Sequence, residues 1–307
     1  MAEDYFPHIW CGWHTLVSAH YVQEVQTMKS TLISFVILVF FTFSLFAFAG
    51  KEKKNICGTA VPGGVAVLKL FPTTQHRPSV YFGGQRVMVV ARGGSWVAVI
   101  GFSLKLKPGK YPVVVSGQGE KEYCRIKIVH KKYTTQYLRI KNRRLVNPNT
   151  KSIKRIKHEK NKSGNIFKTW RFVRHINLRF KVPVKGRMSS RFGVRRVING
   201  KRRNPHSGID IAAPRGTNIV APADGIVVGV GYYFFSGKTV FVDHGQGLIS
   251  MFAHMRSITV KKGQKLVRGE KIGTVGMTGR VTGPHLHWTI SLNNSRVDPT
   301  FFLKSSP

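Results

Sequence analysis

Residues 283–288 read Gly-Pro-His-Leu-His-Trp, and residues 206–210 read His-Ser-Gly-Ile-Asp. In an extended strand, successive side chains alternate between the two faces, so His285 and His287 lie on one face and the leucine between them points the other way. Two imidazoles on one face of a strand can serve a single centre. These two clusters therefore decide how the C-terminal part of the chain is interpreted.

The upstream cluster offers a matching set of polar groups. The same period of two places His206 and Asp210 on one face of a strand, with Gly208 leaving space between them for a metal or a substrate. Two such strands side by side would supply three or four ligands. Zinc accepts histidine nitrogen and carboxylate oxygen, and a catalytic zinc site keeps three protein ligands and a water. An isolated His-x-His is more often an ordinary pair of histidines, but the two clusters together predict a zinc site.

The sequence around both clusters resembles that of a known family. Six motifs occur in order: His-Ser-Gly-Ile-Asp-Ile-Ala-Ala-Pro-Arg-Gly-Thr at 206–217, Ala-Pro-Ala-Asp-Gly-Ile-Val at 221–227, Val-Asp-His-Gly-Gln-Gly at 242–247, Phe-Ala-His at 252–254, Gly-Thr-Val-Gly-Met-Thr-Gly-Arg at 273–280 and Thr-Gly-Pro-His-Leu-His at 282–287. Because several separated motifs appear in the same order, residues 183–303 resemble the M23 family, the LytM or lysostaphin-type zinc peptidases of the cell wall.

The resemblance implies a role for each of five residues. His206, Asp210 and His287 would hold zinc, and His254 and His285 would form the catalytic pair. Zinc can lower the pKa of a bound water to about 7 and polarise a scissile carbonyl, and histidine titrates in the range useful for proton transfer. The chain has no His-Glu-x-x-His motif, so a glutamate base of the thermolysin kind is not expected.

The resemblance also implies a substrate. We expect an exported zinc endopeptidase that hydrolyses peptide crosslinks of peptidoglycan, at the D-alanyl to meso-diaminopimelate bond if the source is Gram-negative. The alternative is a non-catalytic LytM-type activator of wall amidases, or a wall-binding module. Retention of all five histidine and aspartate residues argues against this alternative.

The charge of the chain limits its partners. It has 307 residues, with 50 Lys or Arg against 12 Asp or Glu, which gives a formal net charge of +38. Such a field attracts polyanions. For an exported chain we expect peptidoglycan as the partner, with an anionic wall polymer or a membrane surface contacting the more basic N-terminal half. We expect no nucleic acid partner, because the positive charge is the only feature that would suggest one.

The N-terminus predicts export. Residues 28–49 have the layout of a signal peptide, with Lys29 followed by an apolar run and a small-x-small cleavage site ending at Ala49. Residues 1–27 contain acidic residues and no Lys or Arg, so we interpret them as a non-native extension of the true start. The alternative is that residues 30–49 anchor the chain in the inner membrane. Both interpretations place the C-terminal domain in the periplasm or cell envelope.

The remaining sequence predicts a mostly β fold. Residues 50–135 contain short apolar runs separated by Gly-rich turns, typical of a β-sandwich-like domain, and resemble the domain ahead of some proteobacterial M23 peptidases. Residues 136–179 read as a basic linker with a short helix capped by Asn149 or Thr150. Residues 180–307 should form the antiparallel β peptidase domain with an open groove, and the basic N-terminal half is expected to lie over that groove.

A few individual residues carry further expectations. Cys57 and Cys124 are an even pair, suited to one disulfide in an oxidising compartment. Asp243 and His244 could support a metal ligand, but the glycines that follow favour a structural role at a strand end. The acidic residues Asp224 and Glu270 are expected to lie in turns and to be structural. Arg195 and Arg196 are suited to steering substrate carboxylates.

Overall fold

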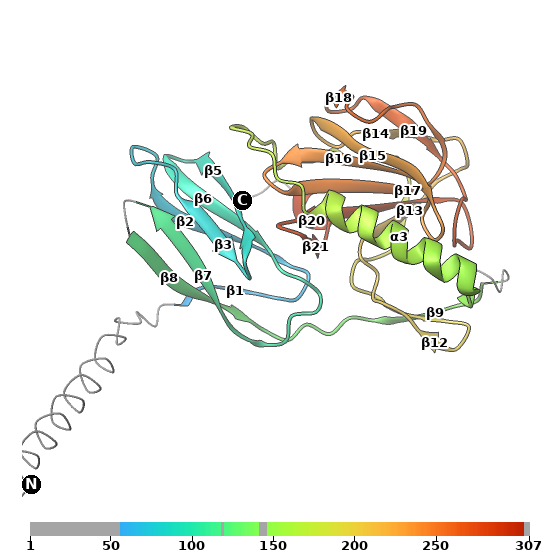
Figure 1. Cartoon of the computed structure of the whole chain (residues 1–307), viewed down its shortest axis with the longest axis horizontal. Helices are drawn as coiled ribbons and strands as arrows, with labels where there is room; N and C mark the ends of the chain where they lie inside the picture. Colours follow the sequence, from blue (N-terminus) through green and yellow to red (C-terminus); the bar gives the residue numbers. More distant parts are fainter. Residues whose placement is uncertain (1–55, 118–119, 141–145, 304–307) are drawn as a thin grey trace, which may run out of the picture. The chain divides into compact units, whose positions relative to one another are not determined.

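The computed structural model describes residues 56–117, 120–140 and 146–303, which Figure 1 draws in colour. The expected extension at residues 1–27 and the expected signal peptide or anchor at residues 28–49 lie outside these ranges. Within the described part of the chain, no helix is both long enough and apolar enough to cross a membrane.

The N-terminal strands form two sheets, as expected for a sandwich-like domain. The described strands are β1 (Ile56–Ala60), β2 (Val65–Pro72), β3 (Ser79–Phe82), β4 (Gln85–Arg86), β5 (Met88–Arg92), β6 (Ser95–Gly101), β7 (Gly109–Gly117) and β8 (Glu120–Ile128). One sheet has the order β1-β8-β7-β3-β4 and the other β2-β6-β5. Strands from both sheets contribute to one apolar core, which includes Val80, Ile100 and Ile126.

Local sequence explains the tight hairpins of these sheets. Gly83 and Gly84 join β3 to β4, and Gly93 and Gly94 join β5 to β6, all with positive φ. A two-residue hairpin turn with positive φ at both central positions favours glycine, because glycine has no Cβ to clash with the backbone. The Gly-Gly pairs of the sequence therefore fix where these hairpins turn.

A disulfide joins the edge strand β1 to β8. Cys57 and Cys124 are bonded, with their Cα atoms 5.7 Å apart, which confirms the expected pairing. Such bonds form and persist in oxidising compartments outside the cytoplasm.

The segment between the two β regions is more ordered than a linker. Residues Thr135–Leu138 form β9, and Thr150–Phe167 form the 18-residue helix α3, longer than the short helix expected. The side chain of Asn149 caps α3 by accepting a hydrogen bond from the Ser152 backbone N–H at 2.9 Å. The last helical residue, Phe167, is buried against Phe241 with ring centroids 5.5 Å apart, so the helix is docked on the C-terminal sheet.

The C-terminal strands form one large antiparallel sheet, as expected. Its described members are β10 (Arg187–Ser190), β13 (Ile209–Ala212), β14 (Asn218–Val220), β15 (Gly225–Tyr233), β16 (Gly237–Gly245), β17 (Leu248–Ile258), β18 (Lys265–Leu266), β19 (Lys271–Val275), β20 (His285–Leu292) and β21 (Ser295–Val297). The main order is β10-β13-β20-β17-β16-β15-β18. A small separate sheet joins β9 to β11 (Arg195–Ile198) and β12 (Lys201–Arg202), and α4 (Thr300–Leu303) ends the described chain.

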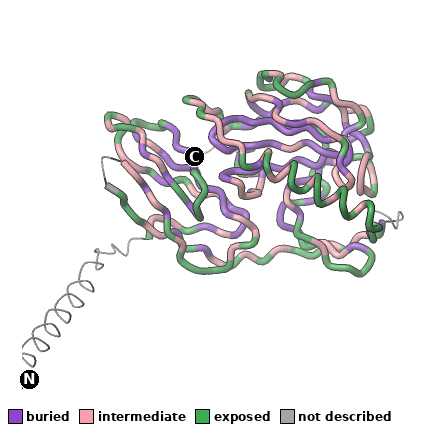
Figure 2. The backbone as a smooth tube through the Cα atoms, viewed as in Figure 1, coloured by how far each residue is buried: buried purple, intermediate pink, exposed green. Residues whose placement is uncertain are grey.

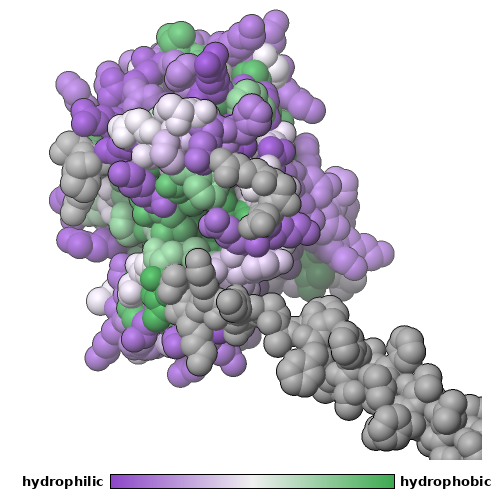
Figure 3. All heavy atoms as spheres, turned by 90° about the vertical axis from the view of Figure 1, so that its left-hand side faces the viewer, coloured by the Kyte–Doolittle hydropathy of each residue, from purple (hydrophilic) through white to green (hydrophobic). Residues whose placement is uncertain are grey.

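Buried residues follow the strands of both regions, whereas α3 is largely exposed (Figure 2). On the face drawn in Figure 3, hydrophilic residues surround a band of hydrophobic ones.

The two β regions also share hydrogen bonds. The buried Gln246 side chain accepts from the Val89 N–H at 3.0 Å and donates to the Val173 carbonyl at 2.7 Å. Asn293 exchanges two hydrogen bonds with the backbone of Gly101.

The pair Asp243 and His244 has structural contacts. Asp243 accepts from the Arg171 side chain at 2.9 Å, while His244 donates through Nδ1 to the Asp224 carbonyl at 2.7 Å. The other His244 nitrogen, Nε2, accepts from the Ser250 hydroxyl at 2.9 Å. Burial lowers the pKa of His244 to about 4, against the opposing effect of its hydrogen bond to Asp224.

This burial makes His244 a source of acid sensitivity. The folded chain keeps His244 neutral down to about pH 4, whereas an unfolded histidine protonates near pH 6.5. The unfolded state therefore binds more protons in this window, so the stabilising contribution is complete above pH 6.5 and is lost as the pH falls. We predict that between pH 7 and about pH 4.5 the free energy of unfolding decreases by about 2 to 3 kcal/mol through this residue.

Urea unfolding at the two pH values measures this effect. His244→Gln should be less stable than the wild type at pH 7 and should show a shallower loss of stability on acidification. His175→Gln, at an exposed histidine, should keep the wild-type slope. Equal slopes for the wild type and His244→Gln would contradict this assignment.

Candidate metal centre

Strand pairing brings the two clusters of the sequence together. β13 and β20 are antiparallel neighbours, and in their register Asp210 lies directly opposite His287. On the other side of β20, Ala253 of β17 lies opposite His287, which places the following residue, His254, beside the same strand. His206 reaches the group from the loop that precedes β13. Residues 206–210 and His254 of β17 thus meet His285 and His287 at β20.

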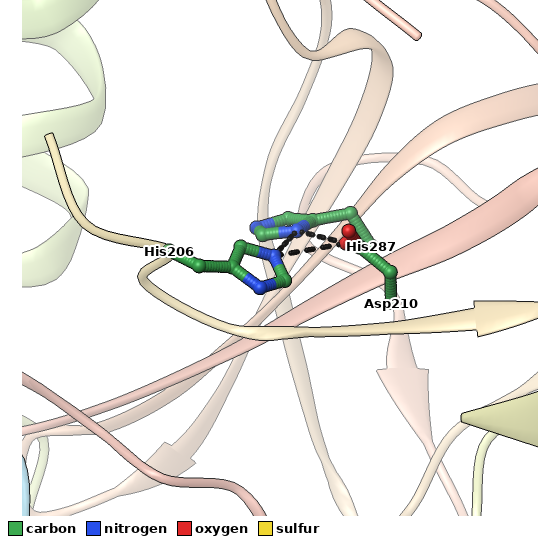
Figure 4. A group of neighbouring side chains, drawn as sticks. All are labelled: His206, Asp210 and His287. Carbon is green, nitrogen blue, oxygen red and sulfur yellow. Dashed lines mark hydrogen bonds and ion pairs between the residues drawn. The ribbon is translucent and has the colours of Figure 1, made fainter. Parts of the chain in front are cut away.

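The three expected metal ligands converge (Figure 4). Asp210 Oδ1 lies 2.8 Å from His287 Nδ1 and 2.9 Å from His206 Nε2, and these two nitrogens are 3.0 Å apart. All three residues are buried, with His206 only 2 % exposed. The three donor atoms therefore form a compact triangle, each edge of which is a direct contact.

This donor set fits zinc. Zinc binds histidine nitrogen and carboxylate oxygen at about 2.0 to 2.2 Å in tetrahedral geometry, so adjacent ligand atoms should lie about 3.3 Å apart. The observed separations are slightly shorter, and small side-chain movements would open the triangle to that size. Two nitrogens and one oxygen also leave the fourth position of a tetrahedron for water or substrate, as catalytic zinc sites require.

Hydrogen bonds orient both ligand imidazoles. His206 donates from Nδ1 to the Arg191 carbonyl at 2.8 Å, and His287 donates from Nε2 to the Thr289 hydroxyl at 2.9 Å. The Arg191 carbonyl can only accept, which assigns the Nδ1–H tautomer to His206, and the Thr289 hydroxyl can accept the Nε2 proton of His287. With these tautomers, the lone pairs lie on His206 Nε2 and His287 Nδ1 and are available to a metal. Both lone pairs belong to the atoms that meet at Asp210. Partners of this kind fix a metal-binding imidazole in its ring orientation and tautomer.

Asp210 is held as a carboxylate. Burial by itself would raise the pKa of Asp210, but when a proton occupies the His206 or His287 nitrogen that faces it, the hydrogen bonds and positive charge of these imidazoles outweigh burial and hold the pKa well below its usual range. The second oxygen, Oδ2, accepts a 2.5 Å hydrogen bond from Arg196 Nη2. Arg196 was expected to steer substrate carboxylates. In the structure it instead binds the carboxylate of Asp210.

The two remaining histidines lie beside this triangle. His254 donates from Nδ1 to the Thr278 carbonyl at 2.8 Å, and His285 donates from Nδ1 to the Gly283 carbonyl at 2.9 Å. Each therefore presents an unprotonated Nε2, and the two rings are 4.9 Å apart. His285 Nε2 lies 3.8 Å from Asp210 Oδ1. All five residues predicted for the site are thus close together.

Burial keeps both of these imidazoles neutral. Burial, together with the positive charges that His285 and His287 can carry, lowers the pKa of His254 to about 3. Burial also lowers the pKa of His285, while the Asp210 carboxylate opposes this effect. His254 has φ of 64°, which is uncommon for a non-glycine residue and costs conformational energy. The bond to Thr278 is one contact that holds it in this position.

A cavity of about 260 Å³ opens beside the histidines. Part of its wall was not predicted. Leu138 and Ile140 line it because β9 pairs in parallel with β11, and Asn199 holds the Ile140 backbone with two 2.9 Å hydrogen bonds. Arg280 also lines it, with its guanidinium 4.2 Å from the Phe235 ring. The sequence signal that could have predicted this wall is the alternation of apolar residues within 136–140, where Leu138 and Ile140 flank Arg139.

Two details of the predicted geometry are wrong. His206 precedes β13 and is not part of a strand, so it does not share a strand face with Asp210. Gly208 does not leave open space, because a Cβ there would lie 2.3 Å from the Trp288 carbonyl oxygen and 2.7 Å from the Thr289 hydroxyl. Glycine is needed at this position to let the backbone of β20 approach.

The fold and the donor set define a class of protein, the zinc metallopeptidases with two histidines and one aspartate on an antiparallel sheet. Residues 204–299 match Peptidase family M23, and residues 58–140 match the Peptidase family M23 N-terminal domain. A crystal structure of a putative peptidase M23 from Pseudomonas aeruginosa is 40% identical, with a TM-score of 0.67, and the match covers 80% of this chain and 96% of that chain. The chain belongs to peptidase family M23.

Two further relatives are similar over about two fifths of the chain. Peptidoglycan DD-endopeptidase ShyA of Vibrio cholerae is 42% identical over 121 residues, which are 39% of this chain and 28% of that protein. DD-carboxypeptidase/endopeptidase Mpg of Neisseria meningitidis is 39% identical over 122 residues, again 39% of this chain and 28% of the relative. The chain therefore matches less than a third of the length of these relatives.

The centre predicts which histidine of the His-x-His pair is needed for metal binding. The purified chain should contain one zinc ion, measured by mass spectrometry of the metal after dialysis. His287→Ala should lose it, because Nδ1 of His287 is one corner of the donor triangle. His285→Ala, two residues away on the same strand, should retain it. Equal zinc contents in the two variants would contradict the assignment.

Proposed function

We propose that the chain is an exported zinc endopeptidase that hydrolyses peptide crosslinks of peptidoglycan. One observation carries this proposal: Asp210 and His287 of the donor triangle line the same cavity as two further imidazoles that each present an unprotonated Nε2. A purely structural zinc site would be closed by a fourth protein ligand and would have no need of neighbouring proton acceptors. The arrangement is that of a hydrolytic site.

His206, Asp210 and His287 are the residues that would hold the metal. When bound, zinc supplies a water of lowered pKa and polarises the scissile carbonyl. The protein supplies the geometry. Arg196 fixes the Asp210 carboxylate, and the Thr289 hydroxyl fixes the His287 ring, so the ligands do not need to reorganise during the reaction.

We assign the proton transfers to His254 and His285. The Nδ1 proton of His254 is committed to the Thr278 carbonyl, so its Nε2 is a proton acceptor at neutral pH and suits the general base. Burial keeps His285 neutral with an unprotonated Nε2, against the opposing charge of the Asp210 carboxylate 3.8 Å away. Once His285 takes up a proton during the reaction, which that carboxylate charge favours, it suits stabilisation of negative charge on the substrate oxygen and proton donation to the leaving amine.

The expected crosslink is the D-alanyl to meso-diaminopimelate bond. Support comes from the names of the similar proteins, a DD-endopeptidase and a DD-carboxypeptidase/endopeptidase. The disulfide between Cys57 and Cys124 supports a site of action outside the cytoplasm, in the periplasm or cell envelope. We also propose the division into residues 50–135, 136–179 and 180–307.

The proposal predicts a specific loss of activity. The wild type should convert crosslinked muropeptide dimers to monomers, as followed by liquid chromatography. His254→Gln should lower the rate by at least about a hundredfold, because it removes the proton acceptor, while retaining one zinc ion per chain. His175→Gln, at an exposed histidine, should cleave at the wild-type rate.

Two results would contradict the proposal. Zinc-loaded wild type that leaves the dimers intact would exclude the endopeptidase activity. Undiminished cleavage by His254→Gln would show that proton transfer does not depend on this imidazole. In that second case the metal assignment would stand and the catalytic pair would need revision.

A further inference from the structure

The exposed side of α3 carries a dense positive charge. The helix contains six Lys or Arg residues and one acidic residue, Glu159. Five of the basic residues are exposed lysines, which we call the α3 lysine cluster: Lys151, Lys154, Lys157, Lys160 and Lys162. Figure 1 shows the helix lying across the C-terminal sheet. An 18-residue helix is about 27 Å long, so the charge extends well beyond a single anionic group.

The single acidic residue of α3 does not neutralise the cluster. Glu159 Oε1 accepts from Arg155 at 2.7 Å, and Glu159 Oε2 accepts from the Phe234 backbone N–H at 2.7 Å. Arg155 donates to the Tyr232 carbonyl at 3.0 Å. These bonds fix the helix on the turn between β15 and β16. Among the ion pairs formed by described residues, none involves a lysine of the cluster.

The α3 lysine cluster lowers the stability of the helix. Lys151, Lys154 and Lys157 are spaced three residues apart, so their charges are neighbours on the helix surface and repel each other. Lys151 also lies in the first turn, where a positive charge opposes the helix dipole. The Asn149 cap and the burial of Phe167 offset this cost. A surface that lowers stability in this way points to a function in binding.

The turn that holds α3 leads into the wall of the catalytic cavity. The turn that holds the helix continues directly into Phe235 and Ser236, and both line the cavity. The sheet also connects α3 to the metal ligands. Met251 packs in the apolar cluster beneath α3 and lies opposite Thr289 of β20, the residue that orients His287. The helix and the metal ligand His287 therefore lie on the same face of the sheet.

We propose that the α3 lysine cluster is a docking surface for polymeric peptidoglycan, which rests on the proposed function above. The stem peptides of this polymer carry free carboxylates at repeated intervals. With one crosslink in the cavity, the lysine ammonium groups bind the carboxylates of neighbouring stem peptides on the same strand. The cluster thereby favours intact polymer over small soluble fragments, and its contribution depends on salt because the lysines are exposed.

A pair of matched triple variants tests this surface. The cluster variant carries Lys151→Gln, Lys154→Gln and Lys157→Gln. The control variant removes the same charge from three exposed lysines of the N-terminal region, by the substitutions Lys105→Gln, Lys107→Gln and Lys110→Gln. Circular dichroism and thermal unfolding confirm that both variants are folded. Binding to purified sacculi is measured by co-sedimentation in a His254→Gln background, so that the polymer stays intact.

The cluster variant should bind sacculi about tenfold more weakly than the control variant at low salt, and the difference should shrink at about 300 mM salt. With His254 restored, the cluster variant should cleave soluble dimers at the rate of the control variant and intact sacculi more slowly. Both variants should bind vesicles of phosphatidylglycerol equally.

Three results would overturn the proposal. Equal binding of the two variants to sacculi would show that the cluster is only a solvated surface. Loss of vesicle binding with sacculus binding retained would assign the cluster to a membrane. An equal decrease in the cleavage of dimers and sacculi would show an effect on the catalytic site itself. A wild type that cleaves neither substrate defeats the proposed function, while the co-sedimentation result still decides whether the cluster binds polymer.

Discussion

The pairing of Asp210 with His287 across β13 and β20 is the constraint on which the site depends. A slip of one residue in this register would turn every side chain of one strand to the other face and separate the two ligands. Gly208 permits the close approach of β20, since any Cβ there would meet the Trp288 carbonyl. His206 then closes the triangle from the adjoining loop. Backbone pairing therefore positions the metal ligands before any metal binds.

Hydrogen bonds from the surrounding backbone complete this arrangement. Carbonyl oxygens accept the Nδ1 protons of His206, His254 and His285, and a hydroxyl accepts the Nε2 proton of His287. Each imidazole is thereby left with one defined lone pair. Burying several polar groups is costly unless each has a partner. Here the partners also decide which ring nitrogens are available for the metal and for proton transfer.

The sequence singled out five candidate site residues, because His285 and His287 alternate on a strand and the surrounding motifs have a recognisable order, and the structure places these five residues close together. It also predicted the cap at Asn149. It did not predict the cavity wall formed by Leu138, because that wall depends on β9 pairing with a strand far along the chain. For the same reason Arg196, whose partner is Asp210, was assigned to substrate. The local sequence period shows which side chains share one face of a strand. Which residues of other segments lie opposite them depends on strand pairing between distant parts of the chain, which the period does not show.

The most direct test of this account is a crystal structure of the zinc-loaded chain with anomalous data collected at the zinc edge. We predict one anomalous peak at about 2.0 to 2.2 Å from His206 Nε2, His287 Nδ1 and Asp210 Oδ1, with His254 and His285 outside the coordination sphere. Coordination through His287 Nε2, or a peak that binds His254 in place of Asp210, would contradict it.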